Sequence, residues 1–158
     1  DAISSGSGSF IHGFTYSSHP ISLAAGQAVL QYILEHKLVE AADSDREGSI
    51  GHMLKENLAQ LRMMNHVGEV RGIGLLWAVE FVSDTESRDS FPVAVNFSGQ
   101  VAQAAIERGL LVYPVQGCAD GDCGDHVLIA PPAVITPDQI TWACEQLSAA
   151  IEEVSAQA

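Results

Sequence analysis

The stretch HGFTYSSHP, residues 12–20, places two histidines, two aromatic side chains and four hydroxyl groups within nine residues. Thr15, Ser17 and Ser18 stand just ahead of an apolar pattern that begins near Pro20. Hydroxyl groups and unpaired backbone N–H groups ahead of a helix attract anions, because the helix dipole is positive at that end. The stretch is therefore a candidate phosphate site, although physics alone favours a capped and buried helix start.

A second candidate is RGIG, residues 71–74, because a Gly-x-Gly pair can belong to a dinucleotide-binding loop. Such a loop opens a helix and has a third glycine, whereas the residues after Gly74 alternate as a strand and include Trp77. We therefore prefer a structural interpretation, in which the glycines let a strand start close to a neighbouring helix.

Residues 118–126, CADGDCGDH, hold side chains of the kinds that bind calcium and zinc. The calcium pattern lacks its glutamate, and the zinc pattern lacks a fourth ligand and a CxxC pair. We therefore expect a solvated hairpin turn rather than a metal site.

A serine nucleophile is a further possibility, from Ser4, Ser17 or Ser18 with His12 or His19 as the base. The sequence has no G-x-S-x-G elbow, and closeness in sequence does not establish geometry in space. We do not favour serine hydrolysis.

The composition excludes two classes of partner. With 7 basic and 20 acidic residues, the formal charge is −13, which repels nucleic-acid phosphates and anionic lipid head groups. No apolar run reaches the roughly 18 to 20 residues of a membrane span, and the first residues, DAISSGSGSF, lack the basic and apolar regions of a signal peptide. The 3 cysteines, an odd number, argue against a secreted disulfide framework. We expect a cytoplasmic protein with free thiols that binds neither nucleic acid nor membranes.

Apolar residues spaced by threes and fours predict helices at about 20–34, 50–61 and 98–108. The polar patch DSDREGS, residues 43–49, separates the first two. A last helix follows Thr136, with Pro137 at its first position and Gln139 three residues on, which predicts a capping box.

Three strands are predicted between these helices. Residues 75–82 alternate with the period of a strand, and LLVYPV (110–115) and HVLIA (126–130) are short apolar runs. Pro131 and Pro132 end the last of them, because proline cannot donate a hydrogen bond to a sheet.

The predicted fold is α/β: a small C-terminal domain with a roughly three-stranded sheet flanked by helices, joined by a long helix to an N-terminal arm. We expect residues 1–19 to be an extended arm from a larger domain, 20–63 a linking helix or helix pair, and 64–158 the small domain. The chain opens on Asp1 without an initiator methionine, and we expect it to be a truncated piece of a larger protein.

Four blocks, HGFTYSSHP, VRGIGLLWAVEF, GLLVYP and GDHVLIAPPAVIT, resemble in that order the C-terminal part of class III aminotransferases. These are fold type I enzymes that depend on pyridoxal 5'-phosphate and include the ω-transaminases. The resemblance covers nearly the whole chain. It implies a homodimeric enzyme that transfers an amino group from an amine or amino acid to a keto acid or aldehyde.

The resemblance also assigns residues in the opening stretch. The family's loop usually reads T-Y-S-G-H-P, and its threonine reaches the cofactor phosphate of the other subunit, so the matching residue is Thr15. The aromatic residue before it lines the neighbouring active site in ω-transaminases, which implies the same role for Phe14.

The sequence departs from the family at two positions. Ser18 stands where the family usually has glycine, and Tyr113 stands where many ω-transaminases carry an arginine that pairs with a substrate carboxylate. A tyrosine cannot make a bidentate ion pair, so another group binds the keto acid or the substrate preference differs. Tyr113 is thus a candidate substrate-pocket residue.

The reaction needs a lysine that holds the cofactor as a Schiff base. The family's lysine lies upstream of the T-Y-S loop, and the lysines here, Lys37 and Lys55, fall on predicted helices that do not match it. We therefore expect the chain alone to be inactive, with no catalytic or metal-binding residue of its own.

Two alternatives remain at this point. An aminomutase or a decarboxylating transaminase would use the same fold. A freestanding α/β interaction module that never meets the cofactor would explain the missing lysine.

Overall fold

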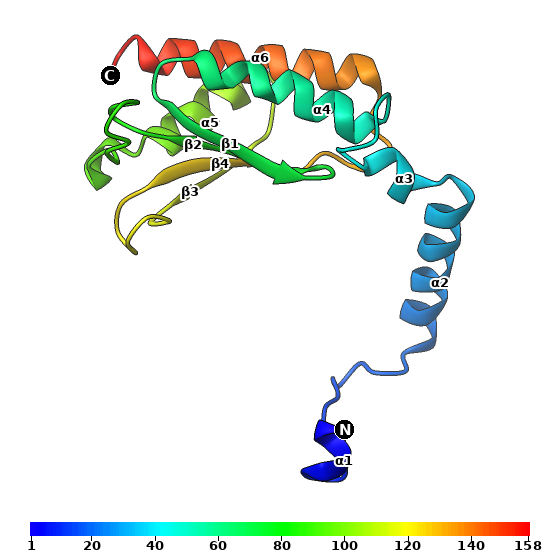
Figure 1. The fold of residues 1–158 in the computed structure, drawn as a ribbon. Coiled ribbons are helices and arrows are strands. Elements are labelled where there is room, and N and C mark those ends of the chain that lie inside the picture. Colours follow the sequence, from blue (N-terminus) through cyan, green and yellow to red (C-terminus); the bar gives the residue numbers. More distant parts are fainter. The chain divides into compact units, whose positions relative to one another are not determined.

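The computed structural model describes residues 1–158 and divides them into two units, Asp1–Lys37 and Leu38–Ala158. Figure 1 shows the elements of both units in chain order. None of the helices has the length and apolar character needed to cross a lipid bilayer.

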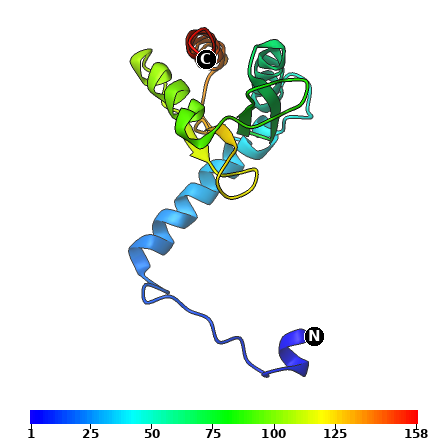
Figure 2. The same ribbon diagram turned by 90° about the vertical axis from the view of Figure 1, so that its left-hand side faces the viewer.

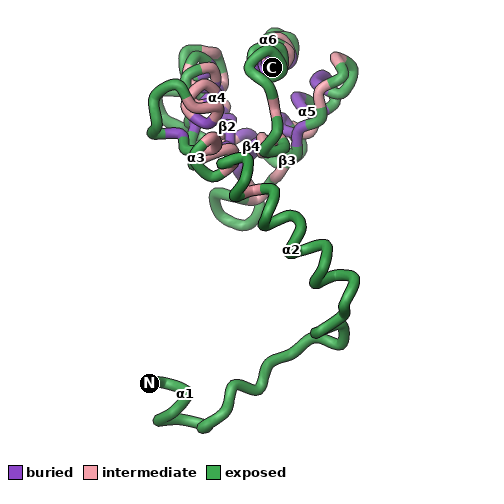
Figure 3. The backbone as a smooth tube through the Cα atoms, turned by 90° about the vertical axis from the view of Figure 1, so that its right-hand side faces the viewer, coloured by how far each residue is buried: buried purple, intermediate pink, exposed green.

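The first unit consists of a short helix α1 (Ala2–Ser5), a connecting segment and helix α2 (Pro20–Glu35). Its residues are all exposed except Ile33, which is partly buried (Figure 3). Helix α2 begins at Pro20, as predicted, because proline at the first helical position gives up no hydrogen bond. The expected arm therefore contains one helical turn and is not extended throughout.

The second unit is built on one four-stranded sheet. Its strands are β1 (Val67–Ile73), β2 (Leu76–Phe81), β3 (Tyr113–Gln116) and β4 (Asp125–Ile129). They lie in the order β1-β2-β4-β3, and every neighbouring pair is antiparallel.

Three helices of this unit, α4 (Ile50–Ala59), α5 (Phe97–Glu107) and α6 (Pro137–Ser155), pack on one face of the sheet (Figure 1). The short helix α3 (Leu38–Ala42) contacts α4, and η1 (Gln60–Met63) and η2 (Val93–Val95) are 3-10 turns. Figures 1 and 2 show α4, α5 and α6 on the same side of the sheet. The α/β fold class predicted from the sequence is thus confirmed.

The core lies between these helices and the sheet. Val70, Val79 and Val127 are in register across β1, β2 and β4, and each is at most 1% exposed. Because side chains alternate between the two faces of a strand, the neighbours of these valines point to the other face, which no helix of the second unit covers (Figure 2). We call this second surface the open face.

The sheet has four strands, one more than predicted. The missed strand is β1, where only Val67 and Val70 are buried and the pairing register shifts between Val67 and Glu69. A strand with few buried residues and an irregular register gives no clear alternation, so its pattern alone does not identify it.

The glycine of RGIG at position 74 makes the turn that joins β1 to β2. Gly74 has a φ of 60°, in the region that glycine adopts without steric cost. A Cβ atom there would lie 3.3 Å from the carbonyl oxygen of Ala42 in α3. The expected close approach to a helix is present, but a hairpin turn is the main requirement, and RGIG does not open a helix.

The predicted helix at about 98–108 is α5, and Gly109 follows it with a φ of 84°. The predicted strand at 110–115 begins only at Tyr113, which pairs with Leu128. The strand predicted at 126–130 is β4, which ends before Pro131 as expected. Residues 110–112 thus lie outside the ladder.

The capping box predicted for the last helix is confirmed at the start of α6. Gln139 N donates to Thr136 Oγ1 at 3.3 Å, and Thr136 N donates to Gln139 Oε1 at 3.0 Å. Pro137 occupies the first turn. These bonds satisfy backbone donors that a helix start otherwise leaves unpaired.

A buried carboxylate joins β4 to the start of α5. Asp125 is 1% exposed, and its Oδ1 accepts hydrogen bonds from Ser98 N at 2.9 Å and from Ser98 Oγ at 2.7 Å. The N-cap residue of α5, Asn96, makes no capping bond with its own side chain. Asp125 therefore serves as a cap from a distant part of the sequence, at the end of the helix that favours negative charge.

Candidate functional site

The segment 14–19 folds into two consecutive turns. Phe14 N donates to Ser17 Oγ at 3.0 Å, and Ser17 N donates to the carbonyl oxygen of Phe14 at 2.9 Å. His19 N then donates to the carbonyl oxygen of Tyr16 at 3.2 Å. The hydroxyl of Ser17 is thus used within the turn, because it holds the backbone of Phe14.

Ser18, which replaces the usual glycine of the family's loop, lies within the second turn. Its φ is 65°, in the left-handed region that favours glycine. The backbone therefore has a glycine-like conformation here even though the residue is serine.

The start of α2 is capped by a histidine and is not buried. Ser22 N donates to Nδ1 of His19 at 3.3 Å, and the Ser22 hydroxyl lies 3.0 Å from the same nitrogen. The expectation of a capped, buried helix start is right about the cap and wrong about the burial, since these residues are exposed in this chain.

Thr15 and Phe14 are both presented on the surface of the first unit. Thr15 is exposed, and its hydroxyl makes no hydrogen bond within the chain. Phe14 is 74% exposed, and its ring meets His12 edge-on with 5.0 Å between the ring centroids. A free hydroxyl and an exposed aromatic ring therefore lie side by side in the sequence without an internal structural role.

Neither lysine lies in a setting that suits covalent cofactor chemistry. Lys55 Nζ bonds to Asp45 Oδ1 at 2.8 Å, on the surface. Lys37 is exposed and follows the end of α2 with a φ of 51°. A lysine acts as a nucleophile at neutral pH where burial or a neighbouring positive charge lowers its pKa, and neither setting is present here.

Tyr113, the third predicted site residue, lies on the open face in the second unit. A row of paired residues, Arg71, Ala78, Leu128 and Tyr113, crosses all four strands. Tyr113 is 68% exposed at the edge strand β3. Tyr113 belongs to the second unit, whereas Thr15 and Phe14 belong to the first.

The adjacent row on the open face is polar and was not recognised from the sequence. It pairs Glu69 with Glu80, Glu80 with His126, and His126 with Val115. Arg71 from the first row donates to Glu69 Oε2 at 2.8 Å and also to Glu80 Oε2. The hydrogen bond to Glu80 is the main cause of the raised pKa of Arg71, whereas partial burial of the guanidinium acts to lower this pKa. This arginine is already neutralised by two carboxylates, so it is a poor receptor for a further carboxylate.

His126 is the buried member of this row. It is 9% exposed, and its Nδ1 has no hydrogen-bond partner. Burial lowers the pKa of the imidazole from its ordinary value, and the nearby Arg71 charge lowers it further, while Glu80 and Asp125 act in the opposite direction. The lowered pKa therefore favours the neutral form of the imidazole.

Comparison with known proteins identifies the family. A family model described as aminotransferase class-III matches residues 1–151. The chain belongs to the class III aminotransferase family. The resemblance noted in the four sequence blocks is therefore confirmed.

Curated class III relatives match over most of the chain. It is 38% identical over 141 residues to the uncharacterized aminotransferase YodT of Bacillus subtilis, which is 89% of this chain and 31% of that protein. It is 31% identical over 133 residues to a probable gamma-aminobutyrate transaminase 3, mitochondrial, of Oryza sativa subsp. indica, which is 84% of this chain and 24% of that protein. The chain thus spans less than a third of the length of these relatives.

Solved transaminase structures show the same fold. A transaminase from the marine bacterium Virgibacillus matches with a TM-score of 0.83 and 29% identity, over 98% of this chain and 33% of that one. A thermostable (S)-enantioselective omega-transaminase from Thermomicrobium roseum matches with a TM-score of 0.77 and 32% identity, over 96% of this chain and 31% of that one.

Proposed function

We propose that this chain is the C-terminal part of a pyridoxal 5'-phosphate-dependent aminotransferase that moves an amino group from an amine or amino acid to a keto acid or aldehyde. The family match over residues 1–151 carries the proposal. The names of relatives support the substrate class, since one is a gamma-aminobutyrate transaminase and another an omega-transaminase.

The residues present fit one part of the cofactor, its phosphate. The Thr15 hydroxyl is exposed and has no partner in the chain, as a group reserved for an external acceptor would be. Such a hydroxyl can donate a charge-assisted hydrogen bond to a phosphate oxygen. The settings of Lys37 and Lys55 do not fit the aldehyde end of the cofactor, so we assign the Schiff-base lysine to the polypeptide upstream.

Bound pyridoxal phosphate supplies the electron sink that lets an amino group leave one carbon skeleton and join another. The contribution of this chain is to bind and to orient. In a homodimer, Thr15 fixes the phosphate in the neighbouring subunit's site, and Phe14 forms an apolar wall of that site. The turn bonds between Phe14 and Ser17 set the direction in which these adjacent side chains leave the backbone.

In the second unit, Tyr113 is proposed to line the substrate pocket and to affect which substrates bind. Its phenol can donate one hydrogen bond but carries no positive charge, so it cannot hold a carboxylate as an arginine does. Arg71 cannot substitute, since Glu69 and Glu80 already engage it. We propose that a keto acid is bound by a group outside this chain, or that the preferred acceptor lacks a carboxylate.

We further propose that residues 1–19 form an arm, residues 20–63 a linking helical region and residues 64–158 a small domain. The full-length protein is proposed to be a cytoplasmic homodimer. The chain by itself is proposed to be inactive, because it lacks the lysine.

The test uses the product of the full gene. We expect pyridoxal phosphate to give it a visible absorbance band that borohydride reduction removes, with the reduced cofactor fixed on a lysine upstream of Asp1. A panel of amines, amino acids, keto acids and aldehydes then defines the reaction. A full product that binds no cofactor, or that moves no amino group in any pairing, contradicts the proposal.

A further inference from the structure

Leu128 lies directly opposite Tyr113 on the open face. The two residues are in register between β3 and β4, and side chains paired in this way on one face have Cβ atoms about 5 Å apart. The next residue along the same row is Ala78 on β2, which pairs with Leu128 from the other side. Tyr113 therefore has an aliphatic neighbour and, beyond it, a small one.

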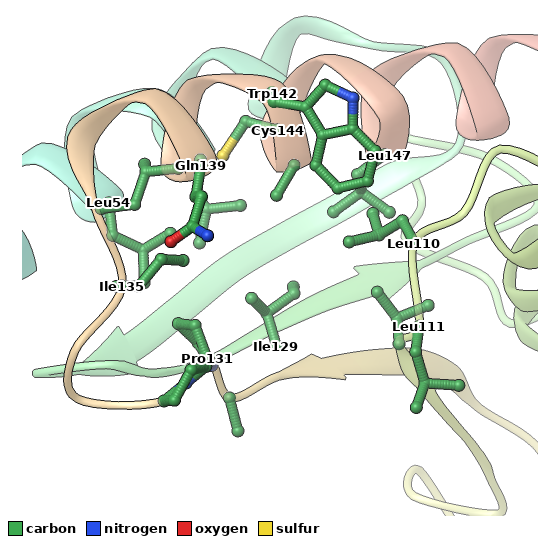
Figure 4. Close-up of a pocket in the computed structure, with 16 residues that line it drawn as sticks. Leu54, Leu110, Leu111, Ile129, Pro131, Ile135, Gln139, Trp142, Cys144 and Leu147 are labelled. Atoms are coloured by element: carbon green, nitrogen blue, oxygen red, sulfur yellow. The ribbon is translucent and has the colours of Figure 1, made fainter.

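The core of the second unit does not use the Leu128 side chain. The next residue in the chain, Ile129, points to the helix side of the sheet, where it lines an apolar cavity of about 330 Å³ between α6 and the end of β4 (Figure 4). Leu128 is half-buried, and it neither lines this cavity nor belongs to the hydrophobic core. Its side chain is therefore available for contact on the open face.

The charges around this pair disfavour an anion. Arg71 is the only lysine or arginine among the paired residues of the sheet, and both Glu69 and Glu80 already engage it. Two carboxylates and one guanidinium leave a net negative charge, and the lowered pKa of His126 favours its neutral form. A carboxylate placed beside Leu128 would be repelled, whereas an uncharged group would meet apolar surface.

We propose that Leu128 is a specificity-determining residue of the full-length aminotransferase. Together with Tyr113 it contacts the end of the substrate that is distant from the reacting amino group, and it selects an uncharged aromatic or aliphatic group there. The inference rests on the proposed function, which places Tyr113 in the substrate pocket. A group that packs on the Tyr113 ring also meets Leu128, because the paired side chains share one surface.

The first experiment compares a large and a small amino donor in the full-length enzyme. It follows the half-reaction in which benzylamine or ethylamine gives its amino group to the bound cofactor and leaves as the aldehyde, so no acceptor is needed. We expect Leu128→Ala to lower the second-order rate constant for benzylamine by about tenfold and to leave that for ethylamine unchanged. The loss should appear as a higher half-saturating amine concentration at an unchanged maximal rate, since the contact is remote from the reacting bond.

Ile73→Ala is the matched control. Ile73 is also an aliphatic residue of the open face, two positions after Arg71, but it lies on β1, at the opposite edge of the sheet from Tyr113. We expect this variant to keep both rate constants within about twofold of the original values.

The second experiment changes the charge at the same position. The donors are benzylamine and 4-(aminomethyl)benzoate, which differ only in a carboxylate at the end away from the amino group. We expect the original enzyme to prefer benzylamine by at least about tenfold, and Leu128→Lys to reduce this preference by at least about tenfold, because it places an ammonium group opposite Tyr113.

The outcomes separate this inference from the proposed function. An active enzyme that prefers 4-(aminomethyl)benzoate overturns the inference alone, as does equal sensitivity of the benzylamine rate to Leu128→Ala and Ile73→Ala. An equal loss for ethylamine and benzylamine in Leu128→Ala, or an unchanged preference in Leu128→Lys, also overturns it. A full-length protein that gives no borohydride-sensitive band with pyridoxal phosphate and moves no amino group overturns the proposed function, and this inference with it.

Discussion

Thr15 carries a hydroxyl that no group within the chain engages, and the proposed function gives it a phosphate oxygen as its partner. A hydrogen bond to a charged group contributes about 1.5–3 kcal/mol. We therefore expect Thr15→Ala to raise the Kd of the full-length enzyme for pyridoxal phosphate by about 10- to 100-fold. Thr15→Ser keeps the hydroxyl and should stay near the original value. Equal affinity in the alanine and serine variants would remove Thr15 from the phosphate site.

Asp125 is a second single residue with a large expected effect, this time on stability. Its carboxylate accepts two hydrogen bonds from Ser98 while almost fully buried. Asp125→Ala leaves the buried Ser98 N–H unpaired, whereas the Ser98 hydroxyl keeps the Val115 carbonyl as an acceptor. We therefore expect the free energy of unfolding to fall by about 1–3 kcal/mol in urea titrations. Asp122→Ala, in the exposed loop before β4, should change this free energy by less than about 0.5 kcal/mol.

His126 links stability to pH through its lowered pKa. In the unfolded chain the imidazole has its ordinary pKa of 6.5, whereas in the folded chain burial lowers that value. As the pH falls through 6.5, the unfolded state therefore takes up the proton first. The stability contribution is full above this pH, declines below it, and levels off once the folded state is also protonated.

The test compares the chain with His126→Gln across this range. We expect the stability difference between the two proteins to change as the pH is lowered below 6.5, and to be constant above it. Arg71, Glu80 and Asp125 are the charged groups that act on the ring, and they remain in both proteins. A difference that does not vary with pH would show that the ring titrates normally.

The capping box at the start of helix α6 can be tested separately. The two bonds between Thr136 and Gln139 close its first turn. Thr136→Ala should lower the free energy of unfolding by about 1 kcal/mol, which urea titration measures as a lower midpoint at constant slope. Thr141→Ala, on the same helix beyond the cap, is the control, because its hydroxyl only bonds back to the Pro137 carbonyl. An equal loss in both variants would contradict a special role for the cap.

The strands of the sheet differ in how clearly their sequence patterns identify them. β2 has four buried residues and β4 has three, and the sequence identified both. β1 has two buried residues and a shifted register, so its sequence pattern did not identify it as a strand. The open face was missed for a related reason, since Glu80 and His126 become neighbours only when β2 and β4 pair.

At the scale of the whole molecule, the two units differ in how far they bury their own side chains. Leu38–Ala158 contains the hydrophobic core, whereas no residue of Asp1–Lys37 is buried. We therefore expect residues 38–158, expressed alone, to unfold cooperatively with a Tm within about 3 °C of the whole chain. Calorimetry of both proteins checks this. A much lower Tm for residues 38–158 would mean that the first unit stabilises the second.

Local chemistry is what the sequence by itself determined about this protein. The Pro20 helix start, the Thr136 capping box and the stop at Pro131 each depend on residues within about four positions, so their types suffice to predict them. The order of four short blocks likewise sufficed to recognise the class III family. The other features were decided only by the tertiary structure, because each of them depends on residues far apart in the chain. Pairing of β2 with β4 put Glu80 beside His126, the contact of Ser98 with Asp125 spans 27 positions, and only packing of α6 over the end of β4 formed the apolar cavity.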